Sequence, residues 1–281
     1  MLTQKTVKNV VKFAGIGVHT GVVSYVEVHP APVDYGLVFV NEQKPELFFK
    51  VGTVVPEAAM HATVFNFRGW VVSTVEHLMA ALYALGITNA QIHVRGSEIP
   101  ILDGSAFIFA QEVKASGIED QGVLQMCLRP KAAIKLHDEQ GRFIVLDPTD
   151  SEDLEVDYSG DFKHPLVGAQ AMQGIVSEDF FMHQVAPART FGFLAQLPLL
   201  RKHQLALGSS LGNTVVIGDE MMNEMRLPDE CIRHKVLDLI GDLSLLGMPL
   251  VAHVTAHKTS HQFNRLVVQH RLNNPELWLI A

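Results

Sequence analysis

The chain has 281 residues, 48% of them apolar and 19% charged, and this balance excludes a generally disordered protein. A net charge of −8 without any basic block excludes the usual surface of a nucleic-acid-binding protein. The two cysteines, Cys127 and Cys231, are too few for a disulfide framework and suit a reducing cytoplasm, where we expect the protein to act. We expect no signal peptide, because residues 1–8 lack its apolar core, and no membrane span, because no uncharged apolar stretch of about 18 residues occurs.

The first part of the chain is predicted to form a strand-rich layer that carries two helices. Apolar residues between turn signals predict strands over 5–13, 22–29, 37–41, 47–51, 60–65, 70–72 and 88–95. Helices are predicted over 75–85, which Gly86 ends, and over about 107–116. The glycine-rich turn 15–21 has neither the spacing of a nucleotide-binding loop nor a following helix, so we do not expect it to bind phosphate.

A polar, turn-rich stretch over 117–122 is where we place a domain boundary, which gives domains 1–121 and 122–281. The second domain begins with strands again, and they are predicted over 124–128, 132–136, 141–147, 154–158, 214–217 and 250–255. Helices are predicted near 178–184, around 233–243 and over 262–273, while 188–207 is apolar and favours helix.

An internal repeat links the two domains. Aligning Gly86 with Gly247 superposes the apolar positions of the helices that precede them, and it sets His77 on Asp238. Both helices end in Leu-Gly and lead into a strand. We therefore predict an α+β fold of two related domains, each a sheet layer with packed helices, that face each other about a pseudo-twofold axis.

The helix around 233–243 carries a candidate metal site. His234 and Asp238 are four residues apart, so they lie on consecutive turns of one helix face and can share one divalent ion. If the two domains face each other, His77 arrives opposite Asp238 and completes a set of three. Three nitrogen and oxygen ligands without cysteine are typical of a catalytic Zn²⁺, whose open position keeps a water with a pKa of about 7. The alternative is an ordinary His–Asp pair on the solvated edge of a helix.

Further residues beside this set suit proton transfer. Glu76 precedes His77 and can take a proton from the water as general base, or it can simply complement the helix dipole from the first turn. His261 is expected on a loop, where it can protonate a leaving group while Asp242 orients its imidazole. A loop histidine on its own is more often inert.

Three more residues are candidates for contacts with negative charge. Lys235 and Lys258 can neutralise an anionic substrate, although each is also compatible with solvated surface. Thr190 can donate its hydroxyl to a developing oxyanion, or it is an ordinary threonine at a strand end.

Five segments resemble the UDP-3-O-acyl-N-acetylglucosamine deacetylases, the zinc amidase family of lipid A biosynthesis in Gram-negative bacteria. The resemblance lies in GIGVHTG (15–21), STVEHLMAAL (73–82), EIPILDGS (98–105), ARTFGF (188–193) and RHKVLDLIGDL (233–243). It runs in order from the N-terminus to about residue 270. Five motifs in one order are far more specific than STVEHLMAAL (73–82) or EIPILDGS (98–105) alone.

The resemblance implies a fold and a set of functional residues. The fold is a β-α-α-β sandwich of two α+β domains with an insert in each. Segment 191–207 falls in the second insert, which lines a passage for the fatty acyl chain of the substrate. The implied residues are the Zn²⁺ ligands His77, His234 and Asp238, the base Glu76, the acid His261 with its partner Asp242, the carbonyl-polarising Thr190, Lys235 at the substrate or oxyanion, Phe191 near the sugar or acyl entrance, and Lys258 near the anionic or polar part of the nucleotide sugar.

The chain departs from the family pattern at two places. Ser260 and Arg265 replace a glycine and an asparagine of the usual Gly-His-x-Leu-Asn-Asn motif, in which phenylalanine also replaces the leucine. Ser209 stands where a second glycine is usual. Neither change removes a proposed catalytic group, so we expect an active enzyme.

The implied reaction is zinc-dependent hydrolysis of the N-acetyl group of UDP-3-O-acyl-N-acetylglucosamine, giving acetate and UDP-3-O-acyl-glucosamine. One alternative is a metal-dependent phosphohydrolase that uses the same His/Asp set, although such sites usually gather more carboxylates around two ions about 4 Å apart. Another is a binding protein with a structural metal, although structural zinc prefers four protein ligands, commonly cysteines. The sequence leaves the oligomeric state open.

Overall fold

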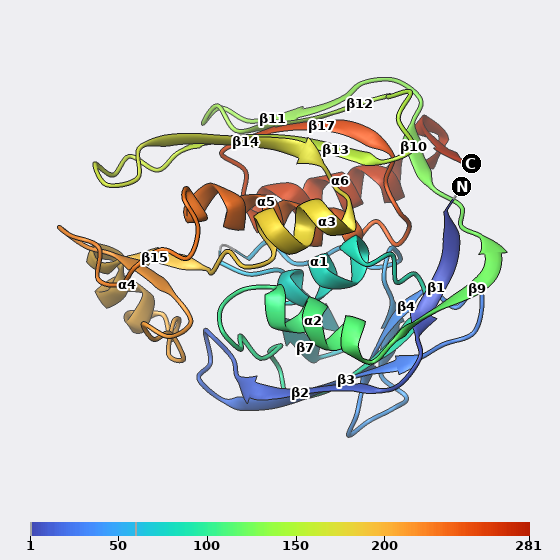
Figure 1. The fold of residues 1–281 in the computed structure, drawn as a ribbon, viewed down its shortest axis with the longest axis horizontal. Helices are drawn as coiled ribbons and strands as arrows, with labels where there is room; N and C mark the ends of the chain where they lie inside the picture. The colour runs from blue at the N-terminus through green and yellow to red at the C-terminus, as the bar shows by residue number, and fades with distance from the viewer. Residues whose placement is uncertain (1, 60) are drawn as a thin grey trace.

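The protein is a layered sandwich in which helices lie between two outer sheets (Figure 1). The fold is taken from a computed structural model that describes residues 2–59 and 61–281. Within these residues each outer layer is a mixed five-stranded sheet, and one hydrophobic cluster runs through both halves of the sandwich. The predicted α+β class and β-α-α-β layering are confirmed.

The first sheet is built from strands whose side chains alternate between buried and exposed, as a half-buried sheet requires. Its order is β2 (Val11–Ile16), β3 (Val23–Pro30), β8 (Ala90–Arg95), β4 (Leu37–Asn41) and β5 (Phe48–Lys50). Neighbours are antiparallel except for the parallel pair β8 and β4. A hairpin of β6 (Val64–Phe67) and β7 (Trp70–Ser73) leads into the helices α1 (Glu76–Ala84) and α2 (Phe107–Ala115).

The second sheet repeats this plan. Its order is β11 (Ile134–His137), β12 (Phe143–Asp147), β17 (Ala252–His257), β13 (Leu154–Asp161) and β14 (Ala169–Ile175). The parallel pair, β17 and β13, occupies the third and fourth places in the sheet, as β8 and β4 do in the first sheet, and the other neighbours are antiparallel. Helices α5 (Glu230–Ser244) and α6 (His261–Asn273) flank β17 in the chain as α1 and α2 flank β8. The predicted repeat is therefore confirmed at the level of topology.

The two halves meet along α1 and α5, which pack against each other at the centre of the sandwich (Figure 1). Gly241 of α5 permits this approach, because a Cβ there would lie only 2.2 Å from the backbone oxygen of Glu76. Gly86 and Gly247 follow these helices with φ of 70° and 81°, a left-handed conformation that glycine adopts without strain. The close packing carries the first turn of α1 to the middle of α5.

The interpretation of 117–122 as a turn-rich linker is wrong in its local structure. Strand β9 (Ile118–Leu124) occupies it and pairs antiparallel with β1 (Thr3–Val7). The stretch is polar because this two-stranded ribbon lies on the surface, so most β9 side chains are exposed. The placement of a domain boundary after residue 121 stays a prediction.

Several other elements differ from the sequence interpretation. The predicted strand 5–13 is two strands, β1 and β2, and the predicted strand 60–65 begins at residue 60, which lies outside the described residues. Helix was expected near 178–184, where α3 (Glu178–Phe180) continues as a π-helix over Phe181–Val185. The chain also ends with an unpredicted short helix (Pro275–Leu277) and strand β18 (Trp278–Ile280), which pairs with β10 (Leu128–Pro130).

The segment 188–207 is only partly helical. It opens with β15 (Phe191–Phe193), which pairs parallel with β16 (Val215–Ile217), and continues through a 3₁₀ turn (Leu194–Gln196) into α4 (Leu197–Lys202). The expectation of helix over the whole segment is therefore wrong, and the segment projects from one end of the sandwich (Figure 1). No helix in the part of the chain that the structure describes is both long and apolar enough to cross a bilayer.

Candidate metal centre and active site

Three predicted ligands meet where α1 packs on α5. His77 comes from α1, and His234 and Asp238 come from α5; one ligand atom from each lies within 4.8 Å of the others. All three side chains are buried. Among the described residues, His77 Nδ1 and Asp238 Oδ1 are buried without a hydrogen-bond partner, which is rare for polar atoms unless a further group binds them. The set therefore fits a metal ion.

The protonation of these side chains also suits metal binding. Burial lowers the pKa of His77 to about 3 and lowers that of His234, so both imidazoles are neutral at neutral pH. His234 Nδ1 lies 3.0 Å from the Ala188 carbonyl, which can only accept, so Nδ1 carries the proton and Nε2 keeps its lone pair. Burial raises the pKa of Asp238, but Lys235 and the histidines outweigh it and hold that pKa below its usual range.

A buried ion pair places the carbonyl that orients His234. The Arg189 guanidinium contacts the Glu230 carboxylate at 3.0 Å, and the Arg189 backbone N–H donates to the same oxygen at 2.8 Å. Glu230 is fully buried at the start of α5. The pair fixes the 188–190 loop against α5, and its role was not predicted from the sequence.

Glu76 and His261 face each other beside the three ligands. Their closest atoms, Glu76 Oε1 and His261 Nε2, are 3.6 Å apart, and His261 Nε2 lies 3.7 Å from Asp238 Oδ2. The second imidazole nitrogen, Nδ1, is 2.9 Å from Asp242 Oδ2. The structure thus brings both predicted proton-transfer groups, and the predicted partner of one, to the same place.

Both groups have strongly shifted pKa values. Burial raises the pKa of the Glu76 carboxyl to about 7; the charge of His261 opposes this shift, while Asp242 and Asp238 add to it. Burial lowers the pKa of His261, but the carboxylates of Asp242, Glu76 and Asp238 outweigh burial and raise it to about 10. A carboxylate able to accept a proton near neutral pH therefore sits opposite an imidazolium able to donate one.

His261 does not lie on a loop, as expected from sequence. It is the first residue of α6, and its predecessor Ser260 has an extended conformation. The loop prediction was wrong because His261 is followed by glutamine and because the apolar face of α6 begins only at Phe263. The helical position makes the imidazole part of a packed element.

Lys235 and Phe191 line the approach to the three ligands. The Lys235 ammonium is 2.6 Å from Asp238 Oδ2 and 5.9 Å from the centre of the Phe191 ring. Burial lowers the pKa of Lys235, but Asp238 outweighs it and the pKa is raised, so the ammonium stays charged. Thr190 lines the same cavity, whereas Lys258 is not in its lining within the described chain and lies 3.9 Å from Asp161.

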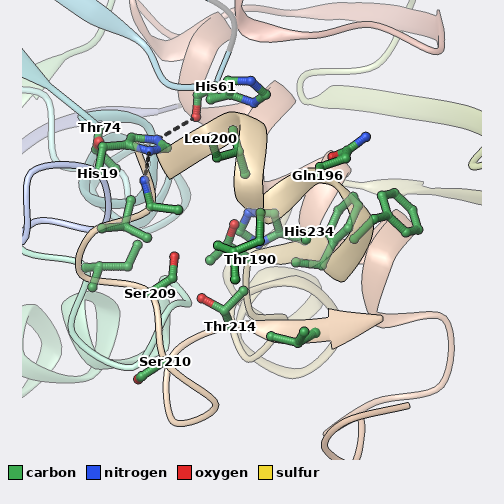
Figure 2. A pocket seen from close by; sticks show the side chains of 18 of the residues that line it. His19, His61, Thr74, Thr190, Gln196, Leu200, Ser209, Ser210, Thr214 and His234 are labelled. Atoms are coloured by element: carbon green, nitrogen blue, oxygen red, sulfur yellow. Dashed lines mark hydrogen bonds between the residues drawn. The ribbon is translucent and has the colours of Figure 1, made fainter. Parts of the chain in front are cut away.

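A cavity of about 470 Å³ joins these residues to the segment that follows β15. Its polar end holds the three ligands, Glu76, His261 and Lys235, and Thr190 and His234 are among the lining residues labelled in Figure 2. The rest of its wall is mainly apolar, with side chains that include Ile101, Phe193, Leu194, Leu197, Leu200 and Leu211. Such a cavity can hold a substrate that has a polar head and an aliphatic chain.

The glycine-rich turn 15–21 also reaches this cavity, through Val18 and His19. One buried carboxylate holds the turn: Glu98 accepts hydrogen bonds from the backbone of His19 and Thr20 at 2.9 and 2.8 Å, and from the Thr74 hydroxyl at 3.0 Å. Gly17 must lack a side chain, because a Cβ there would lie 2.0 Å from Glu98. Three of the five motifs are thus joined by a single side chain.

Besides Glu98, two further residues at this site, His61 and Thr63, were not predicted from the sequence. His61 lines the cavity, and its carbonyl lies 3.1 Å from His19 Nε2 (Figure 2). Thr63 contacts both Glu76 and Asp242. The glycine spacing of 15–21 was a usable signal for the turn, but nothing local marks His61 or Thr63.

Comparison with known proteins agrees with this geometry. The family model described as LpxC, UDP-3-O-acyl N-acetylglycosamine deacetylase, matches residues 4–273. A UDP-3-O-acyl-N-acetylglucosamine deacetylase of Thioalkalivibrio sulfidiphilus is 38% identical over 99% of this chain and 92% of its own length. Proteins of the same name from Chromobacterium violaceum and Acidithiobacillus ferrooxidans are 35% and 37% identical, over 100% and 99% of this chain and 94% and 92% of their own lengths. The chain therefore belongs to the UDP-3-O-acyl-N-acetylglucosamine deacetylase family.

Proposed function

We propose that the chain hydrolyses the N-acetyl group of UDP-3-O-acyl-N-acetylglucosamine, releasing acetate and leaving the free 2-amine of UDP-3-O-acyl-glucosamine, a step of lipid A biosynthesis. Membership of the family supports this reaction. The observation that carries it is the pairing of Glu76 with His261, 3.6 Å apart beside a three-ligand metal set. We further propose that the reaction takes place in the cytoplasm.

His77, His234 and Asp238 would hold one Zn²⁺, because two neutral imidazoles and a carboxylate form the donor set of many catalytic zinc sites. When bound, zinc supplies a coordinated water with a pKa of about 7 and polarises the acetyl carbonyl. Neither cysteine belongs to this set. The three ligands leave room for water and substrate, which a structural zinc with four protein ligands would not.

Glu76 is the proposed general base. Its carboxylate accepts a proton from the attacking water, whose oxygen forms a bond to the acetyl carbon while the carbonyl π electrons move to oxygen. A pKa of about 7 makes Glu76 a better proton acceptor at neutral pH than an ordinary glutamate. Burial keeps bulk water from taking over this role.

His261 is the proposed general acid. Collapse of the tetrahedral oxyanion breaks the C–N bond, and the departing glucosamine nitrogen needs the proton that His261 Nε2 can donate. Asp242 holds Nδ1 on the far side of the ring at 2.9 Å, so Nε2 is the nitrogen that faces Glu76 and the ligands. The two proton carriers thus reach the reacting amide from neighbouring positions.

The remaining predicted residues would hold the substrate. Thr190 would donate its hydroxyl to the oxyanion, and the Lys235 ammonium would stabilise the same negative charge. Phe191 and the leucines after it would contact the sugar and the acyl chain. Lys258 stays a proposed contact for the nucleotide, outside the cavity lining.

The phosphohydrolase alternative finds no support in the site. Within residues 2–59 and 61–281 the three ligands form the one group of three or more histidine, cysteine or acidic side chains able to share an ion. A two-metal phosphohydrolase would need a second such group about 4 Å away.

The test is acetate release from synthetic UDP-3-O-acyl-N-acetylglucosamine. We expect release to stop when a chelator removes the metal and to return when Zn²⁺ is added back, with about one zinc per chain in the active protein. Absence of acetate release from the zinc-loaded protein would refute the proposal. Release of inorganic phosphate instead would favour the phosphohydrolase.

A further inference from the structure

Thr63 occupies a position between the two proton carriers that the mechanism above does not use. It lies just before β6, is 3% exposed, and its backbone N–H donates to Glu76 Oε2 at 3.0 Å. Its hydroxyl contacts Asp242 Oδ1 and lies 3.2 Å from His261 Nδ1. One residue therefore contacts the base, the acid and the carboxylate behind the acid.

The direction of these hydrogen bonds follows from the donors available. A carboxylate can only accept, so the Thr63 hydroxyl gives its single proton to Asp242 Oδ1. The other oxygen, Oδ2, accepts from His261 Nδ1 at 2.9 Å and from Asn264 Nδ2 at 2.8 Å. Thr63 thus binds the carboxylate oxygen that His261 and Asn264 leave free, and its lone pairs face the imidazole N–H.

This arrangement restricts the rotation of the Asp242 carboxylate, which would otherwise be free to turn. A carboxylate held through one oxygen can turn about its last side-chain bond, and His261 would turn with it. Asp242, Asn264 and His261 all come from the second half of the chain, whereas Thr63 and Glu76 come from the first. The Thr63 hydroxyl therefore sets the orientation of the acid relative to the half that carries the base.

We propose that Thr63 is a positioning residue for the general acid: its hydroxyl holds Asp242 so that His261 Nε2 points toward Glu76 and the reacting amide. The inference rests on the proposed deacetylase function. The backbone N–H of Thr63 holds Glu76 in every side-chain variant, so substitutions of Thr63 change the acid's support and leave the contact to the base in place.

The test compares Thr63→Val with Thr63→Ser in the zinc-loaded enzyme. Valine keeps the shape and removes the hydroxyl, whereas serine keeps the hydroxyl. We expect Thr63→Val to lower kcat about 10- to 100-fold, since misplacing one catalytic group costs up to that much, with KM and zinc content unchanged. Thr63→Ser should restore kcat to within about threefold of the unchanged protein.

A spectroscopic measurement separates orientation from activity. The ¹H resonance of His261 Nδ1–H, assigned by its absence in His261→Gln, should shift in Thr63→Val and stay in place in Thr63→Ser. In a His261→Gln background, Thr63→Val should cost no further activity, because the acid that it supports is already gone. This resonance is readable even if the unchanged protein releases no acetate, so failure of the proposed function and failure of this inference are distinguishable.

Thr6→Val is the matched control, because Thr6 is also 3% exposed, its hydroxyl accepts from the Ala31 backbone N–H, and it does not line the cavity. Thr6→Val should lower the melting temperature without changing kcat. The proposal is overturned if Thr63→Val keeps the kcat and the His261 resonance of the unchanged protein, if Thr63→Ser is as impaired as Thr63→Val, or if Thr6→Val lowers kcat equally.

Discussion

The two halves of the molecule share a strand order and a helix arrangement, yet they supply different chemistry. In the first half, the base and one metal ligand are neighbours in the first turn of α1. In the second half, two ligands and Asp242 are spread over two turns of α5, and the acid begins α6. The repeated fold therefore serves as the scaffold, whereas the metal ligands, the base and the acid are different residues at the matching positions of the two halves.

The alignment of α1 with α5 makes this difference concrete. It places His77 on Asp238, so matching positions carry an imidazole and a carboxylate, and it places the base Glu76 on the buried apolar Leu237. Because the two helices are unlike at these positions, the site is asymmetric. The asymmetric site therefore takes its base from the first half and its acid from the second, which suits amide hydrolysis, because one group accepts a proton from water and the other protonates the leaving nitrogen.

The largest effect is expected from removing the base that only the first half supplies. Glu76→Gln keeps the size of the side chain but cannot accept the proton, so kcat should fall about 10²- to 10⁴-fold while one zinc per chain remains bound. The measurement is acetate release beside metal analysis. Leu237→Met, at the matching place on α5, is the control and should leave kcat near its original value; a Glu76→Gln enzyme with undiminished kcat would contradict the assignment.

Loss of the single ligand from the first half should weaken metal binding more than loss of a supporting residue does. His77→Ala leaves two ligands, both from α5, and we expect zinc affinity to fall by more than the about 10- to 100-fold typical of outer-sphere changes. Competition with a zinc-binding dye measures this. His93→Ala, which removes an imidazole from the outer sheet, should not change it. Equal affinity in His77→Ala would mean that α5 alone holds the ion.

Much of the fold and of the metal site could be predicted from sequence, because the signals for them lie within short stretches of the chain. The four-residue spacing of His234 and Asp238 predicts that both lie on one helix face, and the matched Leu-Gly ends of α1 and α5 indicate the repeat. Helix α2 and strand β4 were also placed to within a residue. Each of these signals is contained within about one element, where periodicity and caps act.

The polar contacts that complete the site could not be predicted in this way. Thr63 and Asp242 are 179 residues apart in the chain, and His19 and Glu98 are 79 apart. No periodicity links such pairs, because they form only when separate elements pack. The prediction of helix over 188–207 failed for a related reason. Leucines of this segment line a cavity and a projecting surface, and their pattern resembles the apolar face of a helix.

The pH dependence of kcat should have an acidic limb set by Glu76 of the first half and an alkaline limb set by His261 of the second half. Glu76 must be deprotonated, so kcat rises tenfold per unit below its pKa, which is about 7. His261 must be protonated, so kcat falls as pH rises above its pKa, which is about 10. A dication held at the three ligands repels protons and should lower both values. A pH profile of kcat should lose its alkaline limb in His261→Gln; retention of that limb would assign it to another group.

The smallest effect concerns the packing that brings the halves together. Gly241 matches Ala80 of α1, so Gly241→Ala and Ala80→Gly are reciprocal changes in equivalent buried helix positions. Helix propensity alone predicts that the first stabilises and the second destabilises the fold, each by about 1 kcal/mol. However, a Cβ at Gly241 would lie 2.2 Å from the backbone of Glu76, so we expect Gly241→Ala to lower the free energy of unfolding by about 1–3 kcal/mol. Urea unfolding at constant m value measures both variants. A more stable Gly241→Ala protein would show that α1 can move away from α5. The placement of the metal ligands could then not depend on close contact between these two helices.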